Sequence, residues 1–321
     1  MFTYFLIIII SSLVIYYSGR KFASASSEIG EYFNLSRSVK GATLDAVAGS
    51  FPELMIAIYA VLVFGKFDVG VGTIAGSVLF NTLIIPSIAV LVSPVVFRVS
   101  REVLARDAIF YSISVLVFLA AILYSTSWGL AMAVIFIGIY FWYIDMIIEQ
   151  TETYQENHER MLGAKISVTG KIISAVVNMF IVGIAAYFLT ENAILFAQVL
   201  GIPALIIGFS VIAIATSIPD TVIAITNARK GHTDDVISNV FGSNIFNILI
   251  ALGVPLFLHS AITKTSIDIV SGGIDLVIGL ILATVIVIYF IIDDYTITKK
   301  NAVFTLILYI AFLVYMFIKA F

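Results

Sequence analysis

Ten apolar stretches, each long enough to cross a membrane, make up most of this chain. A hydrocarbon core about 30 Å thick is crossed by a helix of roughly 20 apolar residues. The 321 residues are 61% hydrophobic and 12% charged, which is too apolar for a water-soluble domain. The sequence therefore predicts an all-α integral membrane protein with ten transmembrane helices, at about 2–19, 39–64, 69–96, 108–125, 128–148, 168–189, 203–228, 235–258, 272–292 and 301–320.

One strongly polar segment divides these helices into five and five. Residues 149–167 separate a first repeat, 1–148, from a second repeat, 168–321. Fourteen of the 17 Lys and Arg residues follow odd-numbered helices. Because cytoplasmic loops carry an excess of Lys and Arg, we expect a multi-pass protein of the cell membrane with a cytoplasmic linker and two extracellular termini. Five is an odd number, so the second repeat must be inverted relative to the first.

The second helix of each half contains a copy of one acidic motif. GATLDAVAGSFPELMIAIYA and GFSVIAIATSIPDTVIAITN, 167 residues apart, are identical at 8 of 20 positions. Each copy has a serine and, three residues later, an acid that follows a proline: Ser50 with Glu53, and Ser217 with Asp220. A carboxylate in hydrocarbon is costly, and two at matched positions of an inverted repeat predict a functional site near the bilayer midplane.

The prolines before the acids add oxygen ligands. Proline has no N–H and clashes with the carbonyl one turn earlier, so each motif frees backbone carbonyls. These belong to Ala48 and Gly49 in one copy, and to Ala215 and Thr216 in the other. In lipid such carbonyls need protein or an ion as a partner.

A second pair of copies, GSVLFN and GSNIFN, follows the acidic motifs. Each has a serine and an asparagine one helical turn apart: Ser77 with Asn81, and Ser243 with Asn247. Taken alone, these segments fit close helix packing equally well. Together with the acids they supply two carboxylates, four hydroxyls and two amide carbonyls. Calcium prefers 6–8 such oxygens at about 2.3–2.6 Å, whereas zinc, copper and iron prefer His or Cys, and the chain has no Cys.

At these residues the chain resembles the sodium/calcium exchanger family of the calcium/cation antiporter superfamily. Its two repeats carry G-[TS]-S-x-P-[ED] and G-S-x-x-x-[ND] signatures, which are present here as GSFPE with GSVLFN and TSIPD with GSNIFN. The resemblance implies ten helices in inverted halves, and gating by the helices at 2–19 and 168–189. It also implies ligand roles for Glu53, Asp220, Asn81, Asn247, Ser50, Ser77, Ser217, Ser243 and Thr216, with backbone oxygens of Ala48, Gly49 and Ala215.

Two positions depart from the family pattern or discriminate within it. Gly49 replaces the usual Thr or Ser, so a sodium site there is weakened or built from carbonyl alone. Asn247 is Asp in potassium-dependent relatives and in some prokaryotic exchangers. The Glu–Asp pair with two Asn resembles the animal sodium/calcium exchangers more closely, and proton/calcium exchangers typically lack the proline.

Asp45 is a third departure, two turns before Glu53, where the family usually has an apolar residue and the second repeat has Ile212. Its carboxylate either reaches the cytoplasmic vestibule or pairs with a loop cation such as Lys40. The functional alternative is an acid on the entry path of the ion or a proton-sensing acid.

The sequence thus predicts an antiporter that exchanges Ca²⁺ for Na⁺ by alternating access. Exchange of Ca²⁺ or Mg²⁺ against H⁺ is the alternative, and a cation channel is a weaker one. No protease or zinc-hydrolase motif is present, so we expect no enzyme and no cofactor. The expected partners are membrane lipid and inorganic cations, with no nucleic acid, and the expected functional unit is a monomer.

Overall fold

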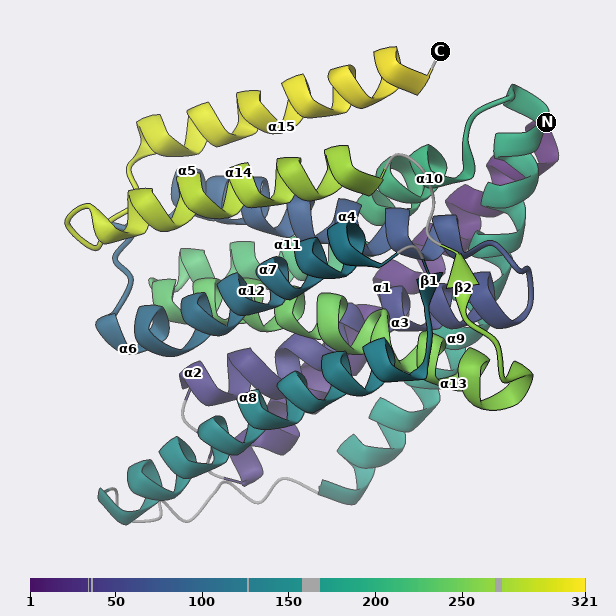
Figure 1. Ribbon diagram of the computed structural model, residues 1–321. Helices are drawn as coiled ribbons and strands as arrows, with labels where there is room; N and C mark the ends of the chain where they lie inside the picture. The colour runs from purple at the N-terminus through teal and green to yellow at the C-terminus, as the bar shows by residue number, and fades with distance from the viewer. Residues whose placement is uncertain (34, 36, 126, 158–167, 269–272, 321) are drawn as a thin grey trace.

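The fold is a bundle of long helices that run between two ends of the molecule (Figure 1). The computed structural model describes every residue except 34, 36, 126, 158–167, 269–272 and 321. Ten helical segments of the described chain are long and apolar enough to cross a membrane, which confirms the predicted number. The predicted all-α class is confirmed too, with one small addition, a pair of two-residue strands that joins two loops.

The first half contains α1 to α8. Its elements are α1 (Phe2–Tyr32), α2 (Arg37–Lys40), the π-helix η1 (Gly41–Asp45), α3 (Ala46–Leu62), α4 (Phe67–Leu83), α5 (Ile85–Val92), α6 (Arg101–Val103), the π-helix η2 (Leu104–Ala108), α7 (Ile109–Tyr124), β1 (Ser127–Trp128) and α8 (Leu130–Asn157).

The second half contains α9 to α15. Its elements are α9 (Val168–Leu200), α10 (Ala204–Ile207), the π-helix η3 (Gly208–Ile212), α11 (Ala213–Arg229), α12 (Thr233–Phe246), the π-helix η4 (Asn247–Ala251), α13 (Gly253–Thr263), β2 (Ile267–Asp268), α14 (Gly273–Ile292) and α15 (Lys299–Ala320).

Successive loops alternate between the two ends. The terminal end, at the right of Figure 1, has both chain termini and the β1–β2 pair. The basic end, at the left, has α6 and the loop between α14 and α15, where Arg98 bridges to Thr296. Asp234 at the start of α12 accepts a hydrogen bond from the backbone N–H of Ser100 over 2.7 Å, which ties the loop of Arg98 to the start of α12 as well.

Several predicted boundaries were wrong because apolar content alone set them. The first helix continues from residue 19 to Tyr32, since small and helix-forming polar residues extend it. The sixth extends past residue 189 to Leu200, because Thr190 and Asn192 bond to carbonyls of their own helix. The predicted linker 149–167 begins inside α8, and its residues 158–167 lie outside the described chain.

Close helix crossings relate the two halves. A Cβ built on Gly76 of α4 would lie 2.8 Å from the Cα of Phe209 in η3. One built on Gly242 of α12 would lie 2.8 Å from the Cα of Ala42 in η1. Gly76 and Gly242 are equivalent in the two repeats, as are Ala42 and Phe209. In each repeat, the helix that contains GSVLFN or GSNIFN therefore packs against the π-helix that precedes the acidic motif of the other repeat. Only glycine fits at these crossings.

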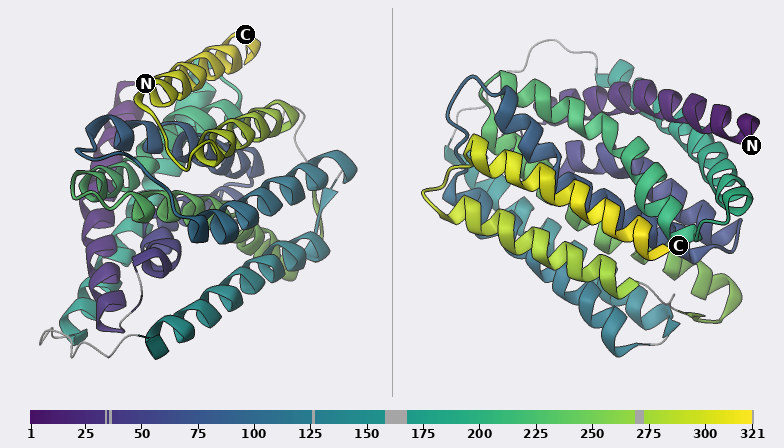
Figure 2. Two further views of the ribbon diagram at one scale, coloured as in Figure 1. Left: turned by 90° about the vertical axis from the view of Figure 1, so that its left-hand side faces the viewer. Right: turned by 90° about the horizontal axis from the view of Figure 1, so that it is seen from above.

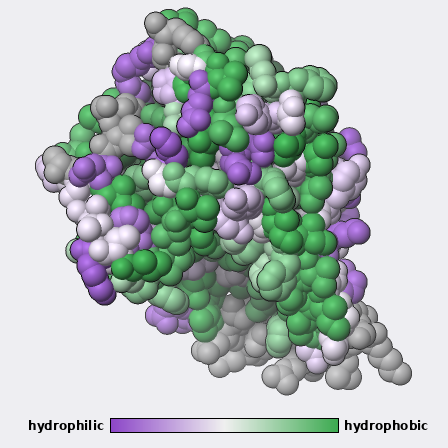
Figure 3. All heavy atoms as spheres, turned by 90° about the vertical axis from the view of Figure 1, so that its right-hand side faces the viewer, coloured by the Kyte–Doolittle hydropathy of each residue, from purple (hydrophilic) through white to green (hydrophobic). Residues whose placement is uncertain are grey.

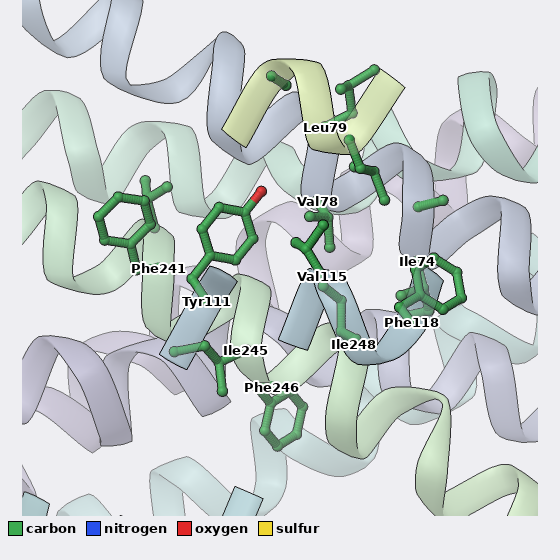
Figure 4. Close-up of a cluster of buried hydrophobic side chains, with 14 of the residues drawn as sticks. Ile74, Val78, Leu79, Tyr111, Val115, Phe118, Phe241, Ile245, Phe246 and Ile248 are labelled. Atoms are coloured by element: carbon green, nitrogen blue, oxygen red, sulfur yellow. The ribbon is translucent and has the colours of Figure 1, made fainter. Parts of the chain in front are cut away.

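The core and the outer surface are both apolar. Aromatic and aliphatic side chains from α4, α7 and α12 pack around Tyr111 and Phe241, whose rings stack (Figure 4). Large apolar side chains also cover much of the outside, among them Tyr289 and Ile307. Figure 3, a view onto the terminal end, shows apolar residues over wide areas with hydrophilic groups between them. A surface of this kind suits lipid rather than water.

Candidate functional site

The two acidic motifs meet in the interior of the bundle. Glu53 is the eighth residue of α3, and Asp220 is the eighth residue of α11. Both helices continue through their internal prolines, Pro52 and Pro219. Glu53 is 0% exposed and Asp220 is 1% exposed, and the two carboxyl groups are close enough to interact electrostatically. Each repeat thus delivers one acid to the same buried region.

Ser77 of α4 connects the two repeats at this point. Its hydroxyl donates to Oε1 of Glu53 over 2.9 Å and lies 2.9 Å from the hydroxyl of Ser217. The side-chain amide of Asn247 donates to the same serine oxygen over 3.4 Å. The second carboxylate oxygen of Glu53, Oε2, has no hydrogen-bond partner. Four predicted site residues from four helix segments therefore form one hydrogen-bonded cluster.

Asp220 lies against the backbone of the opposite repeat. Neither of its carboxylate oxygens has a hydrogen-bond partner. A Cβ built on Gly49 would overlap this carboxylate, at 2.7 Å from its Cγ. Thr216, the equivalent of Gly49, lies within hydrogen-bonding reach of Glu53. Each acid is thus faced by the residue four positions before the other acid, and the absence of a side chain at Gly49 makes room for Asp220.

The remaining predicted residues are buried in α3, α4, α11 and α12. Ser50 donates to the carbonyl of Ser243 over 3.4 Å, and the hydroxyl of Ser243 donates to the carbonyl of Ala46 over 3.5 Å. Ala48 and Ala215 are buried one turn before the prolines. Asn81 is fully buried, and neither polar atom of its side chain has a partner.

Unpartnered buried oxygens distinguish this site from ordinary core. The set comprises Oε2 of Glu53, both carboxylate oxygens of Asp220, and the side-chain oxygens of Asn81 and Asn247. Buried polar atoms are nearly always hydrogen-bonded, because an unsatisfied one costs a few kcal/mol. In the described chain no ion pair involves either acid. A hard cation is the kind of partner that carboxylate and amide oxygens of this type accept.

The ligand types also restrict the ion. Among the residues that the structure describes, no group of three or more His, Cys, Asp and Glu is placed to hold a metal. The site instead has two carboxylates with neutral hydroxyl and amide oxygens, which suits a hard ion such as calcium or sodium rather than zinc or copper.

Asp45 lies apart from this cluster, toward the basic end. Lys40, one predicted partner, pairs with Glu31 over 3.1 Å, and no ion pair of the described residues joins Lys40 to Asp45. Oδ1 of Asp45 has no hydrogen-bond partner. The residue borders a cavity that is open to the basic end.

Sequence reasoning missed a second polar cluster next to the site. Asn244 donates to the hydroxyl of Thr82 over 2.9 Å, and Thr82 lies 2.8 Å from the hydroxyl of Tyr111. Thr284 of α14 donates to Tyr111 over 2.9 Å. The sequence did contain a signal, because Thr82 directly follows Asn81 and Asn244 lies inside the GSNIFN motif. This cluster fixes the two second-motif helices to α7 and α14.

A known protein family matches nearly the whole chain. The family model described as "Sodium/calcium exchanger protein" matches residues 3–148 and 171–318, which is nearly the whole chain in two segments. The chain belongs to the sodium/calcium exchanger family. This is a family of membrane cation antiporters and not of enzymes, so the predicted family, fold class and transporter character are confirmed.

This exchanger-family protein is similar to a bacterial membrane protein in sequence and to two exchangers of solved structure in fold. The inner membrane protein YrbG of Escherichia coli is 30% identical over 261 residues, covering 78% of this chain and 79% of YrbG. The sodium-calcium exchanger NCX_Mj matches with a TM-score of 0.69 at 22% identity over 96% of each chain. The H⁺/Ca²⁺ exchanger CAX matches with a TM-score of 0.77 at 14% identity, over 97% of this chain and 82% of CAX. The two structural matches show a common fold.

Proposed function

We propose that this protein is a secondary active antiporter that exchanges Ca²⁺ for Na⁺ across the cell membrane by alternating access. The observation that carries the proposal is the pair Glu53 and Asp220, one from each inverted repeat, buried together with three unpartnered carboxylate oxygens. The proposed ligands are the two acids with Asn81, Asn247, Ser50, Ser77, Ser217, Ser243 and Thr216, and the backbone oxygens of Ala48, Gly49 and Ala215.

Charge explains why such a site would exchange ions instead of releasing them freely. Two ionised carboxylates in a region of low dielectric repel each other strongly. One Ca²⁺ neutralises both, so a loaded site can be closed off from water at small cost. An empty, charged site resists that closure, because dehydration of unpaired charges is expensive. After Ca²⁺ is released, the binding site can therefore return to the other side of the membrane only with a replacement ion bound. Na⁺ can use the same oxygens.

Sodium is the proposed counter-ion because hydroxyl groups surround the acids. Thr216 and Ser77 both lie within reach of Glu53 and offer neutral oxygens suited to a monovalent ion. Coupling to H⁺ is the second candidate, and Gly49 favours it. Asp220 faces Gly49, which has no hydroxyl, whereas Glu53 faces Thr216, so the first repeat offers one hydroxyl oxygen fewer for a sodium ion. A channel would need no counter-ion at all.

We also propose an orientation. The basic end and residues 149–167 would be cytoplasmic, both termini would be extracellular, and the repeats would span 1–148 and 168–321. Most Lys and Arg residues flank the basic end, in agreement with the excess of positive charge in cytoplasmic loops. The proposed functional unit is one chain, since each chain has both halves of the site.

The test is ⁴⁵Ca²⁺ uptake by proteoliposomes under an imposed sodium gradient, a proton gradient, or neither. We expect uptake with the sodium gradient only. Glu53→Gln should abolish it, because one charge of the calcium-neutralising pair is lost, whereas Glu102→Gln, an exposed residue of α6, should not. Uptake that needs only a proton gradient would support the H⁺ alternative, and uptake with neither gradient would contradict antiport.

A further inference from the structure

A polar cavity of about 430 Å³ opens at the basic end, between α1, α2, η1, α11 and α12. Figure 2, left, looks onto this end of the bundle. We call this cavity the vestibule. Its walls contain four acidic side chains, Glu28, Glu31, Asp45 and Asp235, and three basic ones, Arg20, Lys40 and Lys230.

Several charges of the vestibule are paired. Lys40 pairs with Glu31 over 3.1 Å, and Lys171 pairs with Glu28 over 2.5 Å. His232 lies 3.6 Å from Asp235. Arg20 donates to the hydroxyl of Tyr16 and lies over its ring.

Asp45 differs from these residues. Its side chain is only 8% exposed, it lines the vestibule, and its Oδ1 has no hydrogen-bond partner. Ser27 of α1 lies within hydrogen-bonding reach of the carboxyl group. A buried carboxylate oxygen without a partner, at the inner end of a water-accessible cavity, is poised to bind a cation.

A column of polar side chains leads from the vestibule to the two buried acids. On α12 the column consists of Asp235, Asn239 and Ser243, spaced four residues apart and therefore on one face of the helix. Asn239 is 2% exposed, and neither polar atom of its side chain has a partner. Asp45 itself is close enough to Asp220 to interact with it electrostatically.

The opposite half of the molecule lacks this arrangement. The repeat equivalent of Asp45 is Ile212, and that of Asp235 is Val69, both apolar and 0% exposed. Thr73 takes the place of Asn239. The duplication therefore preserves the buried acids but not the approach to them, because the positions of Asp45 and Asp235 are apolar in the other repeat.

We propose that Asp45 forms an outer binding site for a divalent cation, which holds an incoming Ca²⁺ at the inner end of the vestibule before it reaches Glu53 and Asp220. The site serves the basic end only. Its carboxylate replaces part of the hydration shell of the ion, and Asn239 offers the next neutral oxygen on the way inward. The role in transport rests on the proposed function, whereas the binding of a cation does not.

Binding in the absence of transport provides the first test. Mn²⁺ binding to purified Glu53→Gln protein in detergent, followed by electron paramagnetic resonance, should reveal a residual weak site. Addition of Asp45→Asn should remove that site, and addition of Asp45→Glu should retain it. Addition of Glu102→Gln, an exposed acid of the same end outside the vestibule, should leave it intact. Residual binding that is equal with and without the Asp45→Asn substitution, or that is absent from the Glu53→Gln protein, would overturn the outer site.

The second test is a comparison of the two membrane faces in sealed vesicles of known orientation. Asp45→Asn should raise the half-saturating Ca²⁺ at the basic end about tenfold at low ionic strength, with the maximal rate retained. The effect should shrink as salt is added, because the vestibule is open to solvent. Half-saturation at the terminal end should stay unchanged. An equal change at both faces, or at neither, would contradict the proposal even if antiport itself is established.

Discussion

At the scale of single residues, the contact between Gly49 and Asp220 explains the most unusual position of the motif. The sequence alone indicates only that a hydroxyl is missing where relatives have Thr or Ser. The structure shows that the carboxylate of Asp220 occupies the space that a side chain at this position would need. The two departures from symmetry, Gly49 in place of a hydroxyl residue and Asp220 in place of Glu, meet in this contact.

Gly49→Ala should therefore impair calcium transport more than the small size of the added methyl group suggests. The added methyl group must displace the Asp220 carboxylate, and a misplacement of about 1 Å in a functional site commonly costs about 100-fold in rate. Initial rates of ⁴⁵Ca²⁺ uptake would measure the loss. Gly70→Ala in α4 is the matched control, since its Cβ would meet only Ala57, at 3.6 Å or more. Equal rates for the two variants would show that Asp220 is free to move.

The residues of the candidate site were accessible to prediction because the duplication repeats them. Glu53, Asp220 and the Ser–Asn pairs recur at matched positions, and the structure joins Glu53, Ser77, Ser217 and Asn247 in one hydrogen-bonded cluster. Asn239 and Thr73 were missed, although both continue the same helix faces toward the two ends. Because the two residues differ, a search for identical residues at equivalent positions of the two repeats does not find them.

At the scale of elements, the π-helices are the main feature that the sequence did not predict. η1 (Gly41–Asp45) and η3 (Gly208–Ile212) lie 167 residues apart, directly before the motif helices. The prolines suggested a disturbance at the acids, yet α3 and α11 continue through them and the wider turns come earlier. A π-helix depends on which carbonyl each N–H selects, and local composition hardly affects that choice.

A buried ion pair is a second unpredicted element-scale feature. Arg106 falls between the predicted helices 69–96 and 108–125, but η2 buries it to 3% exposure. Its Nε and Nη2 donate to the carboxylate of Asp107 over 2.5 and 2.9 Å, and the hydroxyl of Tyr143 donates to Asp107 over 3.0 Å. The interaction connects η2 to α8 near the basic end.

Asp107→Asn should destabilise the protein by about 3–5 kcal/mol, because it removes the negative charge that lies against the buried guanidinium group of Arg106. Tyr143→Phe should cost only about 1 kcal/mol, the usual value for one hydrogen bond. Thermal unfolding in detergent would show which of the two variants is less stable. If Asp107→Asn unfolds at the wild-type temperature, the ion pair has no structural role.

At the scale of the whole molecule, the sequence was sufficient to predict ten helices in two inverted halves. The number of helices follows from the lengths of the hydrophobic stretches, and the inversion follows from the odd number of helices in each half. The coupling ion does not follow from the fold. The TM-score is higher for the H⁺/Ca²⁺ exchanger CAX, at 0.77, than for NCX_Mj, at 0.69, although the identity with CAX is lower. The choice between sodium and proton must then lie in a few side chains around Glu53 and Asp220.

The proposed orientation can be tested directly because the chain has no cysteine. Lys66→Cys, in an exposed loop of the terminal end, should react with a membrane-impermeant thiol reagent on intact cells. Lys230→Cys, exposed at the basic end, should react only after the cells are permeabilised. Labelling of position 230 on intact cells would show that the protein has the opposite orientation to the one proposed. The unmodified chain serves as the blank.

The length of α9 has a consequence for the membrane itself. Its 33 residues extend about 50 Å at roughly 1.5 Å per residue, well beyond a hydrocarbon core of about 30 Å. The helix must tilt, thicken the surrounding lipid or extend beyond the hydrocarbon, and α1 packs along it. Turnover in phosphatidylcholine vesicles should therefore pass through an optimum as acyl chains lengthen, while half-saturating calcium stays constant. The bilayer would then be a mechanical component of the transporter, with its thickness setting the resting tilt of the α1–α9 pair.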